Sequence, residues 1–339
     1  MPYIKSIRKD YSEEKQKVSY ADEFKVTGGD KIYTAGGYTV HMFLREGEHQ
    51  LKIENIKTGS NSSKDIRGLT SSVLNGVEIL MVGAGGSSGQ YSGGGGGGEV
   101  LFISRNLATG TYPTVVAPQS ASGAGTYSAG KHGASSTGFS ETAKGGGSGK
   151  GSDDNPSVAY LEVVNAVACG GGGSSRSGGY FGSQGTSVGT GVTRHGGFRG
   201  GQDNAANDGP NYPGGGGGGS GQSRTGNTGG DNAQAGGSGV AYTIVSTGVS
   251  YTWGGGGGGQ TYYAGSGAAG GAGGGGGGSG GSAGASGGAG LNPGGTVGSS
   301  TTGGNGGANT GGGGGGGNGQ NGSPGGQGGS GIIVVRYPA

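Results

Sequence analysis

The stretch that most resembles a chemical motif is KGGGSGKGS at 144–152, which imitates a phosphate-binding loop. Such a loop requires glycine at its first position and Ser or Thr directly after its lysine. Lys144 occupies the first of these positions and Gly151 the last, so the motif fails at both ends. Glycine supplies 101 of the 339 residues, so the many GxGxxG matches are expected by chance and carry no information.

The titratable side chains do not have the spacing of a metal site or a catalytic group. The four histidines are scattered, and the single cysteine, Cys169, excludes an intrachain disulfide and a multi-cysteine zinc site. Adjacent Asp153 and Asp154 precede Asn-Pro, a pattern typical of a turn. The sequence therefore predicts a protein that is not an enzyme and that uses no cofactor and no metal.

Aromatic side chains are better candidates for function, because stiff amphipathic rings offer contact area at low entropic cost. The chain has 16 tyrosines and six phenylalanines, and many of them lie in glycine-rich tracts. The richest stretch spans 180–212 and is dense in Gly, Asn, Asp and Pro, which predicts a loop. A pair of tyrosines, Tyr262 and Tyr263, follows the glycine run 254–259. The receptor-binding candidates are Tyr180, Phe181, Arg194, His195, Phe198, Arg199, Tyr212, Tyr262 and Tyr263. As an alternative, single aromatic residues could simply cap the ends of glycine segments.

Charge divides the chain into two parts with a boundary near residue 75. Residues 1–75 hold 22 of the 40 charged residues, and none lies between Asp231 and Arg336. Apolar residues make up only 28% of the chain, a composition that by itself is typical of disorder. The sequence predicts an N-terminal module over 1–75 and a glycine-rich body over 76–339. The charged residues 1–17 lack the apolar core of a secretory signal, and no run is long enough for a membrane span.

Alternating apolar residues predict strands in both parts, so the fold class is expected to be all-β with irregular segments. In the first part, residues 38–45 and 49–56 predict a β-hairpin. In the second part, strands are expected at 77–82, 99–104, 112–117, 157–164, 240–253 and 332–337. Hairpins are expected at Gly110 and Gly248, and the closing strand is expected beside 77–82, with Arg336 reaching solvent or Glu78.

Five runs of consecutive glycine, 93–98, 214–219, 254–259, 273–278 and 311–317, separate these strands. Collagen is excluded because no strict glycine triplet is kept and only nine prolines occur. The remaining alternatives are a disordered linker and a bundle of polyglycine-II helices, whose N–H and C=O groups all point sideways. The sequence favours the bundle, with the apolar strands clamping it. Pure glycine runs should then lie at its centre, and tracts such as 279–290, which include Ser and Ala, should lie outside.

The order of segments in this chain resembles the glycine-rich domain of bacteriophage tail and fibre proteins. That order is VEILMVGAGG, a glycine run, GEVLFIS–NLATGTYPTVV, more glycine and a final GGSGIIVVRYP. More distantly, it is similar to the tip adhesins of T-even-type phages, whose receptor-binding part is a polyglycine-II sandwich. The resemblance covers roughly 36–117 and 236–339 and implies a virion protein that is made in the host cytoplasm.

Two functions are expected to compete. The first is a tail-fibre or fibre-tip adhesin that binds a host polysaccharide or outer-membrane protein through loops between glycine helices. Residues 1–75 would join it to other virion proteins, as a homotrimer or on a trimeric fibre. The alternative is a structural or decoration protein of the tail or capsid. Ice binding is disfavoured because it requires a regular three-residue spacing on the outer tracts. The net charge of +2 favours neither nucleic acid nor membrane as a partner.

Overall fold

A computed structural model describes residues 19–21, 24–55, 73–123, 128–151, 168–173, 190–201, 212–223, 232–263, 265–298, 302–319 and 322–339. This part of the chain is all-β and contains no α-helix. Nothing in it is helical over a length that could span a membrane. The expected strand at 157–164 lies outside the described residues. The strands are β1 (Ser19–Ala21), β2 (Phe24–Thr27), β3 (Lys31–Ala35), β4 (Tyr38–Phe43), β5 (Gly47–Asn55), β6 (Val73–Val82), β7 (Val100–Ala108), β8 (Gly110–Val116), β9 (Ser136–Gly138), β10 (Glu141–Ala143), β11 (Val192–His195), β12 (Val240–Ser246), β13 (Val249–Trp253) and β14 (Ile332–Pro338).

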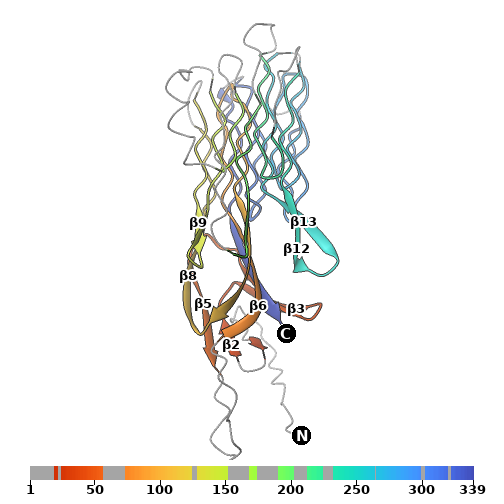
Figure 1. The fold of residues 1–339 in the computed structure, drawn as a ribbon. Coiled ribbons are helices and arrows are strands. Elements are labelled where there is room, and N and C mark those ends of the chain that lie inside the picture. Colours follow the sequence, from red (N-terminus) through yellow and green to blue (C-terminus); the bar gives the residue numbers. More distant parts are fainter. Residues whose placement is uncertain are drawn as a thin grey trace, which may run out of the picture.

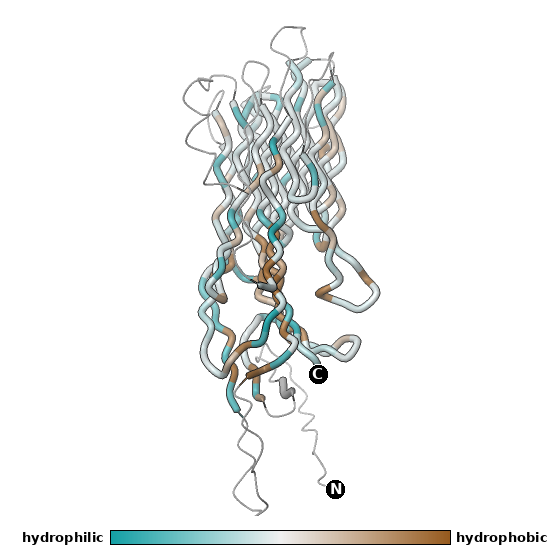
Figure 2. Tube along the Cα trace, viewed as in Figure 1, coloured by the Kyte–Doolittle hydropathy of each residue, from teal (hydrophilic) through white to brown (hydrophobic). Residues whose placement is uncertain are grey.

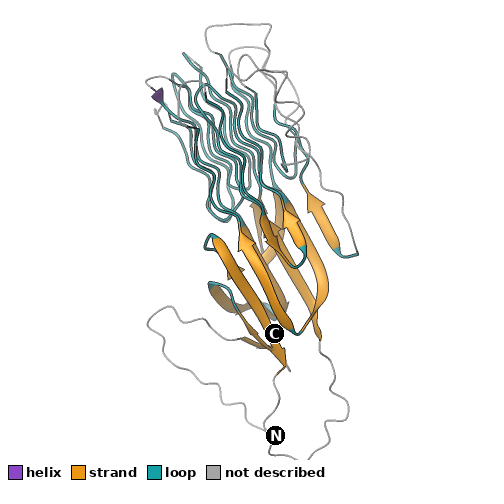
Figure 3. Ribbon diagram, turned by 90° about the vertical axis from the view of Figure 1, so that its left-hand side faces the viewer, coloured by secondary structure: helices purple, strands orange, loops and turns teal. Residues whose placement is uncertain are grey.

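The strands build three antiparallel sheets at one end of an elongated molecule (Figure 1). The first sheet has the order β1-β2-β5-β8-β9-β10, and the second has the order β11-β7-β6-β14-β4-β3. The third is the hairpin β12-β13. Figure 3 shows the strands gathered at this end and the glycine segments extending from them side by side.

The second sheet is buried on both faces. One face packs against the first sheet through a cluster that includes Leu51, Ile79 and Ile333. The other face packs under the hairpin β12-β13 through a cluster that includes Leu80 and Trp253. Because both faces are covered, β6 and β14 carry unbroken apolar runs instead of alternating ones.

The closing strand lies where the sequence predicts it. β14 pairs with β6, and Ile333 stands opposite Met81. Arg336 Nε lies 2.5 Å from Glu78 Oε2, which confirms the expected ion pair. The hairpin of β12 and β13 is also confirmed, with Gly248 at φ 78° in its turn.

Two predicted hairpins are wrong. β4 pairs with β3 and β14, whereas β5 pairs with β2 and β8, so the expected hairpin partners lie in different sheets. β7 and β8 also belong to different sheets, and the chain crosses from one to the other near Gly110. The alternation of apolar residues was sufficient to predict these four strands, but not their partners: β4 pairs with the preceding β3 and the distant β14, and β5 pairs with β2 and β8.

The strands that precede residue 75 do not form a sheet of their own. β2 and β5 share the first sheet with β8, and β3 and β4 share the second with β6, β7 and β14. The change in charge near residue 75 is therefore a change in amino-acid composition, and strands from both sides of it lie in the same sheets.

The glycine segments hydrogen-bond to one another with a period of three. In the run 93–98, successive amides donate to different neighbouring segments, and every third amide returns to the same neighbour. The donor–acceptor pairs are Gly94–Gly215 and Gly97–Gly218, Gly95–Gly314 and Gly98–Gly311, and Gly96–Gly147 and Glu99–Lys144, with N···O distances of 2.7–3.0 Å. Each backbone is thus bonded on several sides at once.

Close approach explains why these runs contain no larger residue. A Cβ atom on Gly257 would lie 2.0 Å from Gly314 O, and one on Gly95 would lie 2.1 Å from Gly86 O. The five pure runs are buried, whereas most of the tract 279–290 is exposed or half-buried. In Figure 2 the hydrophobic colour concentrates in the strands, and the glycine body is mostly pale. The expected division into central and outer segments is therefore present.

Candidate functional site

Four tyrosines gather at the end of the glycine body that is far from the sheets. The run 254–259 leaves β13 at Trp253 and leads to Tyr262 and Tyr263. Tyr91 lies in the turn before the run 93–98, which returns to β7. Tyr212 precedes the run 214–219, whose first amide donates to Gln260 O at 2.7 Å. Three separate segments therefore contribute to one aromatic group, which we call the tip cluster: Tyr91, Tyr212, Tyr262 and Tyr263.

Tyr262 is the centre of the tip cluster. Its ring centroid lies 5.2 Å from that of Tyr91, 6.2 Å from that of Tyr212 and 4.1 Å from that of Tyr263. The ring of Tyr263 stands at 70° to that of Tyr262 and its residue is 53% exposed. Tyr263 and Val249, which lies at the sheet end, are the large hydrophobic residues exposed in the described part of the chain.

Backbone geometry fixes the outer members of the cluster. Tyr91 has φ 48° and Tyr212 has φ 38°, values that a residue with a side chain rarely adopts. Gly319 leaves room for the Tyr91 ring, since a Cβ there would lie 2.3 Å from Tyr91 Cε2. Gln260 Nε2 donates to Tyr212 O at 3.0 Å. Strained backbone of this kind persists only where the surroundings hold it, and it is often found at binding sites.

Buried polar side chains stand next to the rings in the chain. Gln260 and Thr261 are fully buried, and Gln90 is 5% exposed. Gln260 Oε1, Thr261 Oγ1 and Gln90 Oε1 have no hydrogen-bond partner among the described residues. The pKa of Tyr263 is raised, first by its hydrogen bond to Tyr262 and then by the electrostatic interaction with that residue, so the phenol of Tyr263 stays neutral at physiological pH. The cluster can therefore offer ring faces, hydroxyl groups and amides to a ligand.

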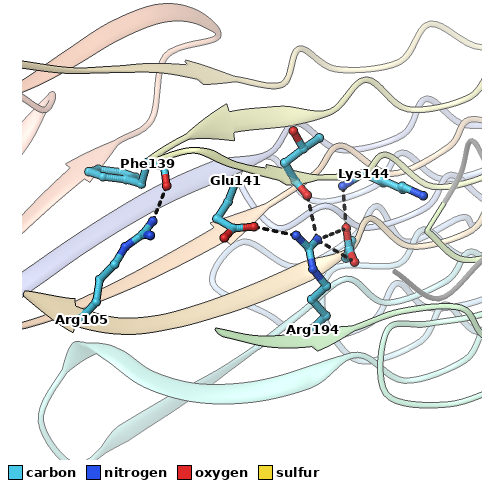
Figure 4. A network of polar contacts seen from close by, with 7 residues as sticks. Arg105, Phe139, Glu141, Lys144 and Arg194 are labelled. Atoms are coloured by element: carbon cyan, nitrogen blue, oxygen red, sulfur yellow. Dashed lines mark hydrogen bonds and ion pairs between the residues drawn. The ribbon is translucent and has the colours of Figure 1, made fainter. Parts of the chain in front are cut away.

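The structure places Arg194 inside the molecule. The segment 192–195 is the strand β11, where a loop was expected, and Arg194 links the edge strands of the two large sheets (Figure 4). Its guanidinium lies 2.7 Å from Glu141 Oε2 and 3.3 Å from Glu99 Oε1. Glu99 also accepts a bond from the backbone N–H of Lys144 at 2.9 Å. Arg194 is 12% exposed, and its role here is to satisfy buried carboxylates.

The other candidates of the 180–212 stretch are also held by internal contacts or lie outside the described residues. His195 Nε2 lies 2.8 Å from the hydroxyl of Tyr242, which stacks on Phe102, and burial lowers the pKa of His195. Phe198 and Arg199 are half-buried, and the Phe198 carbonyl accepts a bond from Gly170. Tyr180 and Phe181 lie outside the described residues. Of the predicted residues, the structure brings together Tyr212, Tyr262 and Tyr263.

Sequence analysis missed Tyr91 and Gln260. Tyr91 has the same context as Tyr212, since each tyrosine stands two residues before a glycine run. That shared position was the available signal. Gln260 directly follows the run 254–259, but nothing in its sequence context predicts burial at the tip.

A cavity of about 600 Å³ lies on the sheet end and has an aromatic lining, but its residues have structural roles. Phe139 belongs to the core and stacks on Tyr112 with ring centroids 5.6 Å apart. Arg105 donates to the Phe139 carbonyl (Figure 4). Among the described residues, no three His, Cys, Asp or Glu side chains come together as metal ligands. Burial raises the pKa of the Cys169 thiol to about 12, which keeps it protonated and unreactive.

Comparison with known proteins does not add a relative. The chain matches no protein-family model and no curated protein. Functional reasoning therefore depends on the tip cluster and on the architecture that carries it.

Proposed function

We propose that the glycine body is a bundle of polyglycine-II helices clamped by the sheets. The three-residue period of amide donation supports this, because a polyglycine-II helix has three residues per turn and bonds only sideways. The distances of about 2 Å from an added Cβ to neighbouring carbonyl oxygens support it as well.

We propose that the protein is a non-enzymatic phage virion protein that acts as a tail-fibre or fibre-tip adhesin. The observation that carries this proposal is the tip cluster, a rigid group of rings from three separate segments at the end of a bonded rod, with Tyr263 exposed to solvent. A rod whose backbone is bonded on all sides projects its tip without bending, and exposed aromatic residues are enriched at binding surfaces. The receptor lies on the host cell surface, and the sheet end, with residues 1–75, docks to other virion proteins as a trimer or on a trimeric fibre.

A structural or decoration role in the tail or capsid is the second candidate. It is favoured by the internal contacts of Arg194 and His195, because residues expected to meet a receptor instead stabilise the protein. Under this alternative the tip tyrosines only cap the glycine segments.

Host adsorption distinguishes the two candidates. Virions carrying Tyr262→Ala and Tyr263→Ala together should assemble normally but adsorb at least tenfold more slowly to sensitive cells if the protein is an adhesin. Virions carrying Val249→Ala, which removes the exposed apolar side chain at the sheet end, should adsorb normally. Unchanged adsorption of the double tyrosine variant would favour the structural role. Localisation of the subunit away from the distal tip in electron micrographs of virions would do the same.

A further inference from the structure

The geometry of the tip cluster also indicates the chemical class of its ligand, and this inference rests on the proposed adhesin function. Tyr263 presents its ring to solvent, and Tyr262 stands beside it at 70°. Two rings at this angle form a corner, and the exposed ring of Tyr263 is its open side. A flat ligand that is apolar on one face and polar around its edge would fit this corner.

The cluster is preorganised, so a small ligand does not have to order it. Tyr262 contacts the rings of Tyr91, Tyr212 and Tyr263, and the first two are fixed by positive φ. A site that is rigid before binding loses little conformational entropy, and weak stacking and hydrogen bonds can then suffice for binding.

The segments that carry the rings have no charged and no aliphatic side chain, and the neighbouring Lys150, whose carbonyl accepts from Gly93 N, is 1% exposed and does not present its charge to solvent. The segments that carry the cluster are 89–92, 212–213, 260–263 and 316–319, which contain only Gly, Gln, Tyr, Ser, Pro, Thr and Asn. A phosphate or acidic ligand would need a cation at the surface of the site. Rings, hydroxyl groups and amides instead match a sugar, whose C–H face stacks on an aromatic ring while its hydroxyl groups form hydrogen bonds.

We propose that Tyr262 and Tyr263 form a subsite for a neutral saccharide, in which the C–H face of a pyranose ring stacks on Tyr263. The wall formed by Tyr262 limits the ligand on one side, and the phenol hydroxyl groups bond to sugar hydroxyl groups at its edge. The ligand is thus a neutral oligosaccharide of the cell surface, and outer-membrane proteins are not the primary contact of this cluster.

The test uses the full-length protein with an N-terminal fluorescent tag and a panel of bacterial strains. Strains that bind the protein are compared untreated, after periodate oxidation, which destroys the vicinal diols of sugars, and after proteinase K. We expect periodate to reduce binding at least tenfold and proteinase K to leave it within twofold. We expect Tyr263→Ala to reduce binding about tenfold, while Tyr263→Phe, which keeps the ring, and Val249→Ala retain most of it.

The outcomes separate the two proposals. Binding that survives periodate but is lost with proteinase K overturns the saccharide subsite and leaves an adhesin that recognises a protein. If the Tyr263→Ala variant binds as well as the unsubstituted protein, the subsite is overturned, regardless of the effects of periodate and proteinase K. The absence of binding to every strain overturns the adhesin function together with the subsite.

Discussion

His41 shows how one residue couples the stability of the sheet end to pH. It is fully buried, its Nδ1 lies 2.7 Å from Gly28 O and its Nε2 lies 3.0 Å from the Tyr337 hydroxyl. A carbonyl can only accept, so Nδ1 carries the proton and Nε2 accepts from Tyr337. Burial lowers the pKa of His41 to about 4, and the bond to Gly28 opposes this only in part.

The depressed pKa of His41 predicts that the protein loses stability in mild acid. Between pH 6.5 and about 4 the unfolded chain binds a proton that the folded protein does not, so the free energy of unfolding falls as pH decreases. The stability that neutral His41 contributes is fully present above pH 6.5. Near pH 4 the free energy of unfolding has fallen by about 3 kcal/mol. The His41→Gln variant should have a lower free energy of unfolding at pH 7. It should not show the part of the decrease between pH 6.5 and 4 that comes from protonation of His41. Denaturant unfolding of both proteins across this range measures the difference, and parallel pH profiles would contradict the assignment.

At the scale of elements, the sequence predicted the long apolar strands and the glycine segments, but it missed short strands such as β3 and β11 and predicted only part of the pairing. The apolar runs of β6 and β14 are continuous because both faces are buried, and their pairing was predicted correctly. Local alternation could not show that β4 and β5 separate into different sheets, because register and partner are set by packing between distant segments. Arg194 was misplaced for the same reason, since its carboxylate partners lie 53 and 95 residues away in the chain. Tyr212, Tyr262 and Tyr263 were found because each lies next to a glycine run, where chain turns must occur.

Close packing of the glycine segments predicts opposite effects for two alanine substitutions. Gly257→Ala places a Cβ 2.0 Å from Gly314 O, so the backbone must move, at a cost of about 3 kcal/mol or more. Gly298 is exposed and has no atom within 4 Å of its Cβ position. Gly298→Ala should therefore be neutral or stabilising by about 0.5 kcal/mol, because alanine restricts the unfolded chain. Thermal or denaturant unfolding measures the change in the free energy of unfolding for both variants. Equal effects at the two positions would show that the segments are not closely packed.

At the scale of the molecule, the sheets and the glycine body should unfold as one unit. Ordering a glycine backbone costs about 1–2 kcal/mol per residue. A lateral hydrogen bond returns about 0.5–1.5 kcal/mol, so the glycine body is marginal without the apolar strands. β14 is the main link, since it lies between β6 and β4 and directly follows the last glycine segment.

Ile333→Ala tests this dependence, because Ile333 is fully buried between the two large sheets. The lost burial and the resulting cavity should lower the free energy of unfolding by about 2–5 kcal/mol. Under cooperative unfolding, amide hydrogen exchange in the central glycine runs should accelerate by the same free energy as exchange in β6, although no glycine contact was changed. Val249→Ala, at an exposed position, should leave both rates almost unchanged. If the glycine amides kept their protection while β6 lost its own, the bundle would be stable by itself. The final strand would then be an attachment and not the clamp that makes a glycine-rich chain fold.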